Sequence, residues 1–380
     1  MKFVFISNYF NHHQKPFCDA MYRILGDGFC FIATSEVSEW RKQLGYLEMT
    51  SEYVMKYDNS CDGLIDGSEI VMIGSAPYTL VKKRLNKNRL TFVYSERIYK
   101  QGVPWLKLPK HYFTFRSRYG RYNNCFLLCA SAFAAYDYSL THCFLGKCYK
   151  WGYFPECKKY DSIDSLITAK SDENRSLNRD ISILWAGRFI DWKHPESMIY
   201  LAKHLKNIGV NFHIDMIGSG DCGKWLNDQI ITENLQESVS LIGSLSPSEV
   251  RKRMELADIF CFTSDRNEGW GAVLNESMNS GCAVVGSDAI GSVPYLINND
   301  VNGMIFKNGN WVDLCSKVDY LISHPMQRAA ISVCAYKTIT EYWNAEQAAE
   351  NILLLVDALN TNTDTPIKNG PCSVANIIKG

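Results

Sequence analysis

The 380-residue sequence lacks the cysteine patterns of zinc-binding and disulfide-rich proteins. No two of its 14 cysteines are spaced C-x-x-C, the common spacing of structural zinc ligands and redox-active pairs. Most of them stand in apolar segments such as "DIFCFTS", where buried free thiols are ordinary. We therefore expect a reducing compartment, which predicts a cytoplasmic protein.

The sequence also lacks a long hydrophobic run. Its longest apolar segment, "CFLLCASAFAAY" at residues 125–136, is far short of the roughly 20 residues that span a bilayer. The first residues, "MKFVFISNYFNHHQKPF", hold four apolar residues in a row and no small-residue cleavage site. We interpret them as a first strand and expect no signal peptide and no membrane span.

No charge of either sign is in excess, because 40 Lys and Arg stand against 40 Asp and Glu. The balance hides an asymmetry, since residues 1–160 carry 22 basic and 13 acidic residues. Between Val71 and Tyr136 there are twelve basic residues and one acid, Glu96, and aromatic residues alternate with the cations in "WLKLPKHYFTFRSRYGRY". This pattern suits an anionic membrane surface or single-stranded nucleic acid. A solvated basic face is the simplest alternative.

Short apolar runs alternate with helical patterns along the chain. The runs "KFVFIS", "GFCFIAT", "EIVMIGS" and "RLTFVYS" predict strands of a first domain, and a pattern over residues 124–141 predicts a helix. The runs "ISILWAGR", "NFHIDMIGSG", "VSLIG", "DIFCFTS" and "CAVVGSD" predict strands of a second domain. Strands that alternate with helices form parallel sheets covered on both faces. The fold class is therefore α/β, with two doubly wound, Rossmann-like domains.

The domain boundaries follow from composition. We expect an N-terminal domain over 1–155, a polar linker over 156–180 and a C-terminal domain over 181–342. Residues 343–359 predict a closing helix, and residues 360–380, which lack periodicity, predict a loose tail. If the two domains face each other, the carboxyl ends of both sheets border one cleft, where open α/β sheets bind ligands.

Two loops of the second domain carry polar motifs. "GSGDCG", from Gly218 to Gly223, matches the G-x-G-x-x-G pattern of dinucleotide sites. It follows the second strand of its domain and not the first, which disfavours NAD and favours a tight turn near a nucleotide. Arg188 and Lys193 lie in the loop after the domain's first strand. Two cations on one short loop suit a diphosphate, whose charge must be neutralised as it leaves; a solvated pair is the alternative.

The stretch "NEGWGAVLNESMNSG" places Glu268 in a loop and Glu276 nearly two turns inside the following helix. Gly269 and Gly271 beside the first acid allow a ligand to approach backbone N–H groups at the start of that helix. Carboxylates beside a phosphate site suit hydroxyl groups better than phosphate, so the pattern fits a nucleotide-sugar. A glycosidase acid/base pair and an ordinary surface loop are the alternatives.

These residues carry a resemblance. The run from Arg188 to Phe306 resembles the nucleotide-sugar-binding domain of glycosyltransferase family 4, whose members are retaining enzymes of the GT-B fold. The matching pieces are "GR…K", "IGSG", "LIGSLSPSEV", "ADIFCFTS", "EGWGAVLNE", "SGCAVVGSD" and "NGMIF". "YKWGYFPE" also resembles members of the bacterial polysaccharide type. The resemblance covers about the last 200 residues well and the first 150 loosely.

The resemblance implies roles for individual residues. Arg188 and Lys193 would hold the donor diphosphate, and Glu268 would contact hydroxyl groups of the transferred sugar. Glu276 would bind the ribose. The residues implied to present backbone groups to the donor are Gly218, Gly243, Leu245, Gly269, Trp270 and Gly271. The sequence contains no D-x-D, which fits a GT-B enzyme with neither a metal nor a cofactor.

The first domain departs from the family pattern. Many members have a glycine-rich loop after the first strand and a histidine after a middle strand, whereas the corresponding segments here are "NYFNHHQ" and "VYSERIY". His12, His13 and Glu96 are therefore the candidate acceptor-side residues.

The sequence predicts a retaining hexosyltransferase that uses a nucleotide-sugar, UDP-linked by expectation, and a glycan or lipid-linked acceptor. It predicts action in polysaccharide or glycolipid biosynthesis at the inner face of a membrane, without a nucleic-acid partner. A sugar-nucleotide epimerase of the same fold and a non-catalytic nucleotide-sugar-binding protein are the alternatives.

Overall fold

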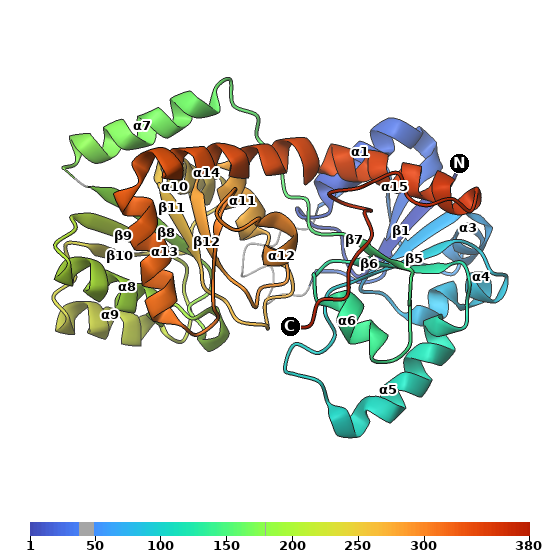
Figure 1. Cartoon of the computed structure of the whole chain (residues 1–380). Coiled ribbons are helices and arrows are strands. Elements are labelled where there is room, and N and C mark those ends of the chain that lie inside the picture. Colours follow the sequence, from blue (N-terminus) through green and yellow to red (C-terminus); the bar gives the residue numbers. More distant parts are fainter. Residues whose placement is uncertain (38–48, 179) are drawn as a thin grey trace. The chain divides into compact units, whose positions relative to one another are not determined.

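The structure is a computed structural model that describes residues 1–37, 49–178 and 180–380. The described chain divides into two compact units, each with its own sheet (Figure 1). Unit 1 consists of Met1–Glu156 and Trp343–Gly380, and unit 2 consists of Cys157–Tyr342. Every strand pair in both sheets is parallel. The prediction of two parallel Rossmann-like sheets is thus confirmed.

Unit 1 has a seven-stranded sheet in the order β3-β2-β1-β4-β5-β6-β7. Strands β1, β4 and β6 are buried along their whole length, as expected for a parallel sheet with helices on both faces. The strands are β1 (Phe3–Ser7), β2 (Phe29–Ala33), β3 (Val54–Lys56), β4 (Ile70–Ile73), β5 (Thr91–Ser95), β6 (Cys125–Cys129) and β7 (Cys148–Lys150). The helices are α1 (Lys15–Leu25), α3 (Cys61–Gly67), α4 (Lys82–Asn86), α5 (Leu108–Phe115), α6 (Ala134–Ser139) and α15 (Ala345–Asn360).

The single helix predicted over residues 124–141 is wrong. Residues 125–129 form β6, which pairs with both β5 and β7, and α6 begins only at Ala134. A short, uniformly apolar run carries no period that separates a buried strand from a buried helix. Its pairing with two neighbouring strands decides the outcome.

The C-terminal residues belong to unit 1. Helix α15, which covers most of the predicted closing helix, packs against α1 (Figure 1). The tail was expected to be loose, but Cys372 and Ser373 are buried and pair with the backbone of Lys150 through two hydrogen bonds of 2.8 Å. Tyr149 and Val374 form an antiparallel bridge. The tail therefore covers the otherwise open edge of β7, a contact that no local sequence pattern encodes.

Unit 2 has a six-stranded sheet in the order β10-β9-β8-β11-β12-β13. The chain runs outward from β8 to β10 and then returns to place β11 on the other side of β8. This reversal is the topological switch point of the sheet. The strands are β8 (Ile181–Ala186), β9 (Phe212–Ile217), β10 (Val239–Gly243), β11 (Ile259–Phe262), β12 (Ala283–Ser287) and β13 (Met304–Phe306).

The helices of unit 2 cover this sheet (Figure 1). They are α7 (Ile163–Ser176), α8 (Glu196–Asn207), α9 (Gly223–Thr232), α10 (Pro247–Leu256), α11 (Val273–Asn279), α12 (Val293–Leu296), α13 (Trp311–Ser323) and α14 (Pro325–Lys337). The start of α10 shows the capping box that "SPSE" predicts. Ser246 accepts from the Glu249 backbone, the Glu249 side chain accepts from the Ser246 backbone, and Pro247 is the first helical residue.

The linker expected over 156–180 is largely helix α7, and residues from Cys157 onward belong to unit 2. The polar composition of this segment conceals one inward face. Ile163, Leu166 and Ile167 lie against Gly281, and Lys170 on the same face is buried. Spacings of three and four residues place these side chains on one side of a helix.

Candidate functional site

The loops that follow β8 and β11 meet at the switch point of unit 2. The Asp265 backbone donates to the Trp192 carbonyl at 3.0 Å, and the Thr263 hydroxyl donates to the Lys193 carbonyl at 2.8 Å. Thr263 in turn accepts from the indole of Trp185 at 2.8 Å. Two hydrogen bonds therefore join the two loops, and a third joins the loop after β11 to strand β8.

Lys193 and Glu268 project from these two loops and form an ion pair. Their side chains are 13% and 12% exposed, so solvent screens the pair only in part. The Ser264 hydroxyl donates to the same Glu268 carboxylate oxygen at 3.1 Å. The Lys193 ammonium also lies 4.9 Å from the centre of the Trp192 ring, within cation–π range.

Arg188 comes from the same loop as Lys193 but is exposed. Its guanidinium lies 5.6 Å from the centre of the Trp192 ring, which is also in cation–π range of the Lys193 ammonium. Arg188 forms no ion pair with any acid in the described part of the chain. The loop thus holds one cation paired with a carboxylate and a second cation open to solvent.

The segment from Gly269 to Gly271 is held by packing. Trp270 is fully buried, its indole donates to Asn275 at 2.9 Å, and its carbonyl accepts from Ser292 at 2.6 Å. Gly271 has a φ of +81°, and a Cβ there would lie 2.2 Å from the ring of Phe262. Trp270 is therefore an anchor that fixes the loop after β11, and only glycine fits at position 271.

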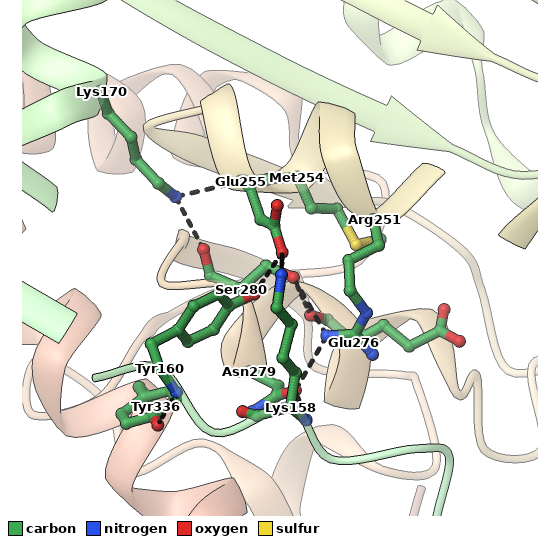
Figure 2. Close-up of polar contacts among 10 residues, drawn as sticks. All are labelled: Lys158, Tyr160, Lys170, Arg251, Met254, Glu255, Glu276, Asn279, Ser280 and Tyr336. Carbon is green, nitrogen blue, oxygen red and sulfur yellow. Dashed lines mark hydrogen bonds and ion pairs between the residues drawn. The ribbon is translucent and has the colours of Figure 1, made fainter. Parts of the chain in front are cut away.

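Glu276 lies on α11, the helix that follows this loop, and is partly buried. Burial raises the pKa of its carboxyl to about 7, and the nearby positive charge of Arg251 opposes the increase. Among the side chains that the structure describes, none donates a hydrogen bond to this carboxylate. Figure 2 shows it pointing away from the cluster that contains Lys158, Tyr160 and Glu255. Glu276 thus has unused acceptor capacity, in contrast with Glu268.

Arg251, on α10, holds the end of α11. Its guanidinium donates to the Asn279 amide oxygen at 2.8 Å and to the Ser280 hydroxyl at 3.4 Å (Figure 2). Asn279 also accepts from the Lys158 backbone at 2.8 Å and donates to its carbonyl at 2.9 Å. The segment before α7 and helix α10 are therefore joined to the helix that carries Glu276.

Lys170, on α7, is a buried cation at the carboxyl ends of α10 and α11. Its ammonium donates to the carbonyl oxygens of Met254, Ala257, Ser280 and Gly281 at 3.1, 2.8, 2.9 and 2.7 Å. A cation there satisfies carbonyl groups that a helix end leaves without intrahelical partners. Burial lowers its pKa. The sequence patterns predicted no role for Lys170 or Arg251. The spacing of the apolar residues before Lys170 is the one signal of its buried position.

The glycines predicted near the nucleotide, Gly218 and Gly243, lie together at the carboxyl ends of β9 and β10. The Gly218 backbone donates to the Gly243 carbonyl at 2.9 Å, and the Ser219 and Ser244 hydroxyls are 3.0 Å apart. Gly218 has a φ of +141°, and a Cβ there would lie 1.8 Å from the Gly187 carbonyl oxygen. Leu245 follows this turn and is partly buried. The G-x-G pattern is thus explained by the close approach of the loops after β8 and β9.

The acceptor-side candidates of unit 1 gather around Tyr153. The rings of His12 and His13 are 3.9 Å apart, and His13 stacks on Tyr153 at 5.8 Å. The Tyr153 hydroxyl donates to Glu96 at 2.6 Å, and Lys100 donates to its other oxygen at 2.6 Å. Burial and the neighbouring His12 lower the pKa of His13 to about 3. At neutral pH this imidazole is therefore uncharged.

Part of the chain is similar to a known protein family. Residues 167–338 match the family described as Glycosyl transferases group 1. The amylovoran biosynthesis glycosyltransferase AmsK of Erwinia amylovora is 30% identical over 140 residues. The match covers 36% of this chain and 34% of that relative, so it spans about a third of the relative's length.

Solved structures show the same fold across both units. Anabaena Alr3699/HepE in complex with UDP has a TM-score of 0.69 at 13% identity, covering 95% of this chain and all of that one. A glycosyltransferase from Rickettsia africae has a TM-score of 0.63 at 15% identity, covering 95% and 99%. At such low identity the likeness establishes the fold alone, which is that of GT-B glycosyltransferases. None of the described helices is both long and apolar enough to cross a membrane.

Proposed function

We propose that the protein is a retaining glycosyltransferase that moves a hexose from a UDP-sugar to a hydroxyl group of a glycan or lipid-linked acceptor. The observation that carries the proposal is the ion pair of Lys193 and Glu268 at the switch point between β8 and β11. A cation suits a diphosphate and a carboxylate suits sugar hydroxyls, and this is the edge at which α/β sheets bind ligands. The UDP in the complex of Anabaena Alr3699/HepE supports the choice of nucleotide.

In the proposed donor complex, Lys193 leaves Glu268 and moves to the diphosphate, with Arg188 as the second cation. Glu268 then accepts hydrogen bonds from hydroxyls of the transferred sugar, and Glu276 accepts hydrogen bonds from the ribose. The backbone at Gly218, Gly243 and Leu245 borders the base, and that at Gly269, Trp270 and Gly271 borders the sugar.

During transfer the bond between the anomeric carbon and the diphosphate breaks, and the diphosphate keeps its electron pair. The acceptor oxygen forms the new bond on the same face, and its proton passes to the oxygen of the leaving diphosphate. Charge that grows on the leaving diphosphate is the largest change in the transition state, so preorganised cations there supply most of the protein's contribution. We propose that Lys193 and Arg188 fill this role without a divalent metal, and that EDTA therefore leaves the rate unchanged.

We place the reaction in the cytoplasm, as one step of surface polysaccharide or glycolipid synthesis. All 14 cysteines are free thiols, nine of them buried, which suits a reducing compartment. The polysaccharide role rests on the similarity to the amylovoran enzyme. Glu96, His12 and His13 are proposed to lie on the acceptor side.

A panel of UDP-, GDP- and ADP-sugars, with and without lipid-linked acceptors, tests the proposal through the release of free nucleoside diphosphate. We expect UDP to be released from one UDP-sugar, and we expect an acceptor to increase the rate of this release. Conversion of the sugar-nucleotide without any acceptor would indicate an epimerase instead. Binding of the donor without turnover would indicate a non-catalytic protein.

A further inference from the structure

A helical arm in unit 1 carries an apolar and basic face with no partner in the described chain. The arm consists of a 3-10 turn over Trp105–Lys107, helix α5 over Leu108–Phe115 and a π-helical turn over Arg116–Gly120. Figure 1 shows α5 at the periphery of unit 1.

The inner face of the arm fixes it to the rest of unit 1. The imidazole of His111 lies 3.1 Å from the Tyr99 hydroxyl. The Phe115 ring packs edge-on against Tyr138 at 5.5 Å, and Tyr119 lies 5.7 Å from Phe144. His111, Phe115 and Tyr119 are spaced four residues apart, which places them on one side of the helix. The opposite side is therefore held in a defined orientation toward solvent.

The outer face exposes large apolar side chains. Leu106 is 100% exposed, Phe113 is 71% exposed and Trp105 is 65% exposed. Phe113 and Trp105 are the two most exposed aromatic side chains in the described part of the chain. Helical spacing places Leu106, Lys110 and Phe113 on one stripe. Large exposed apolar side chains gathered on one helix face favour an interaction surface.

Five cations stand on the arm or directly after it. Lys107, Lys110, Arg116, Arg118 and Arg121 are all exposed, and none of them forms an ion pair with an acid in the described residues. The sequence has no Asp or Glu between Glu96 and Asp137. The positive charge of the arm is therefore not neutralised by ion pairs with the described residues of unit 1.

We propose that the outer face of the arm docks unit 1 on an anionic membrane surface. The side chains of Leu106, Phe113 and Trp105 would enter the boundary between headgroups and acyl chains, and the cations would contact anionic headgroups. A nucleic acid fits less well, because an aliphatic side chain such as Leu106 cannot stack on a base. The proposal extends the proposed function, in which a lipid-linked acceptor is one option, but docking needs no donor and no turnover.

Co-sedimentation of the full chain with vesicles tests the proposal. We expect the protein to bind phosphatidylcholine vesicles that contain phosphatidylglycerol. It should bind pure phosphatidylcholine vesicles much more weakly. Added salt should weaken the binding to the anionic vesicles. Replacing Lys110 and Arg116 by Ala is expected to lower the partition coefficient roughly 10- to 30-fold. The double variant Leu106→Ala/Phe113→Ala is expected to lower it by at least about tenfold.

Lys224→Ala/Trp225→Ala is the matched control, because it removes an exposed cation and an exposed tryptophan from α9 of unit 2. It is expected to bind vesicles as the wild type does. Equal vesicle binding by the wild type and both arm variants would overturn the proposal, as would no binding to anionic vesicles. Arm-dependent binding of a single-stranded oligonucleotide in place of vesicles would reassign the face to nucleic acid. Donor turnover with a soluble acceptor, unchanged in the arm variants, separates this test from that of the proposed function.

Discussion

Lys193 and Glu268 form an ion pair between the loop after β8 and the loop after β11, although 75 positions separate them in the sequence. Neither residue depends on the other unit for this arrangement, because both belong to unit 2. In this ion pair, the Glu268 carboxylate takes the place that the donor diphosphate would take beside Lys193. The Lys193 ammonium takes the place that the sugar hydroxyls would take beside Glu268. The cation and the carboxylate of the proposed site thus already lie side by side, and the proposed donor complex requires their ion pair to break.

Truncation of the pair is expected to abolish most of the transfer activity. Lys193→Ala and Glu268→Ala should each lower kcat/KM about 100-fold or more, because each removes a group that would face developing charge or the reacting sugar. Arg188→Ala should lower kcat/KM only about tenfold, because solvent screens the exposed charge of Arg188. Release of nucleoside diphosphate measures the effect, with Lys224→Ala as the surface control. Full activity of the Lys193→Ala variant would contradict the proposed role of Lys193 in stabilising the leaving diphosphate.

Glu276 should impose a pH dependence on donor use. Its pKa of about 7 means that the carboxyl is protonated in acid and ionised above neutrality. An ionised carboxylate accepts two ribose hydroxyl bonds, so kcat/KM for the donor should rise with pH and level off above about 7. Glu276→Gln should be slower and should lose this limb of the profile. An unaltered limb in the variant would assign the titration to another group.

The same group should also make stability depend on pH. The folded pKa is raised above the ordinary value of 4.5, so the folded state binds more protons than the unfolded state between these values. The stability present below pH 4.5 is therefore lost as the pH rises through about 7. Glu276→Gln should be more stable than the wild type by about 1–2 kcal/mol at pH 8, a figure reduced for partial exposure, and near equal at pH 4. Denaturant unfolding at both pH values measures the difference. A constant difference would contradict the linkage.

Lys170 should be among the most sensitive positions of unit 2. Lys170→Met keeps most of the apolar stem but leaves four carbonyl oxygens without their shared donor. The expected loss is about 3–5 kcal/mol of unfolding free energy. Lys224→Met, at an exposed position on α9, should change stability by less than about 0.5 kcal/mol. A loss at Lys170 no larger than at Lys224 would show that the carbonyl groups find other partners.

Gly218 should not tolerate a side chain. Gly218→Ala places a Cβ 1.8 Å from the Gly187 carbonyl oxygen at a φ of +141°, so the loops after β8 and β9 must separate. The substitution should lower the free energy of unfolding by more than about 2 kcal/mol and weaken donor binding. Gly63→Ala is the control, because a Cβ there meets nothing within 4 Å. Thermal unfolding of both variants provides the comparison, and similar values would refute the steric argument.

The sequence predicted those parts of the structure that local patterns encode. Ser246 and Glu249 form the capping box because its residues are three apart in the chain, and the strand loops carry their polar residues to the predicted sheet edges. The role of Lys170 was not predicted, because its helix has a polar composition. Its contribution to stability comes from hydrogen bonds to carbonyl groups that are distant in the sequence. The tail at Cys372 was not predicted for the same reason, since its pairing with β7 is not local. The roles of His12, His13 and Glu96 stay predictions.

The central claim is that Lys193 binds the donor diphosphate while Glu268 binds the sugar. Calorimetric titration of UDP into the wild type, Lys193→Ala and Glu268→Gln tests it most directly. We expect Lys193→Ala to weaken UDP binding at least about tenfold. Glu268→Gln should bind UDP as tightly as the wild type or more tightly, because the substitution releases Lys193 from its ion pair. Unchanged affinity in Lys193→Ala, or a loss confined to Glu268→Gln, would contradict the account.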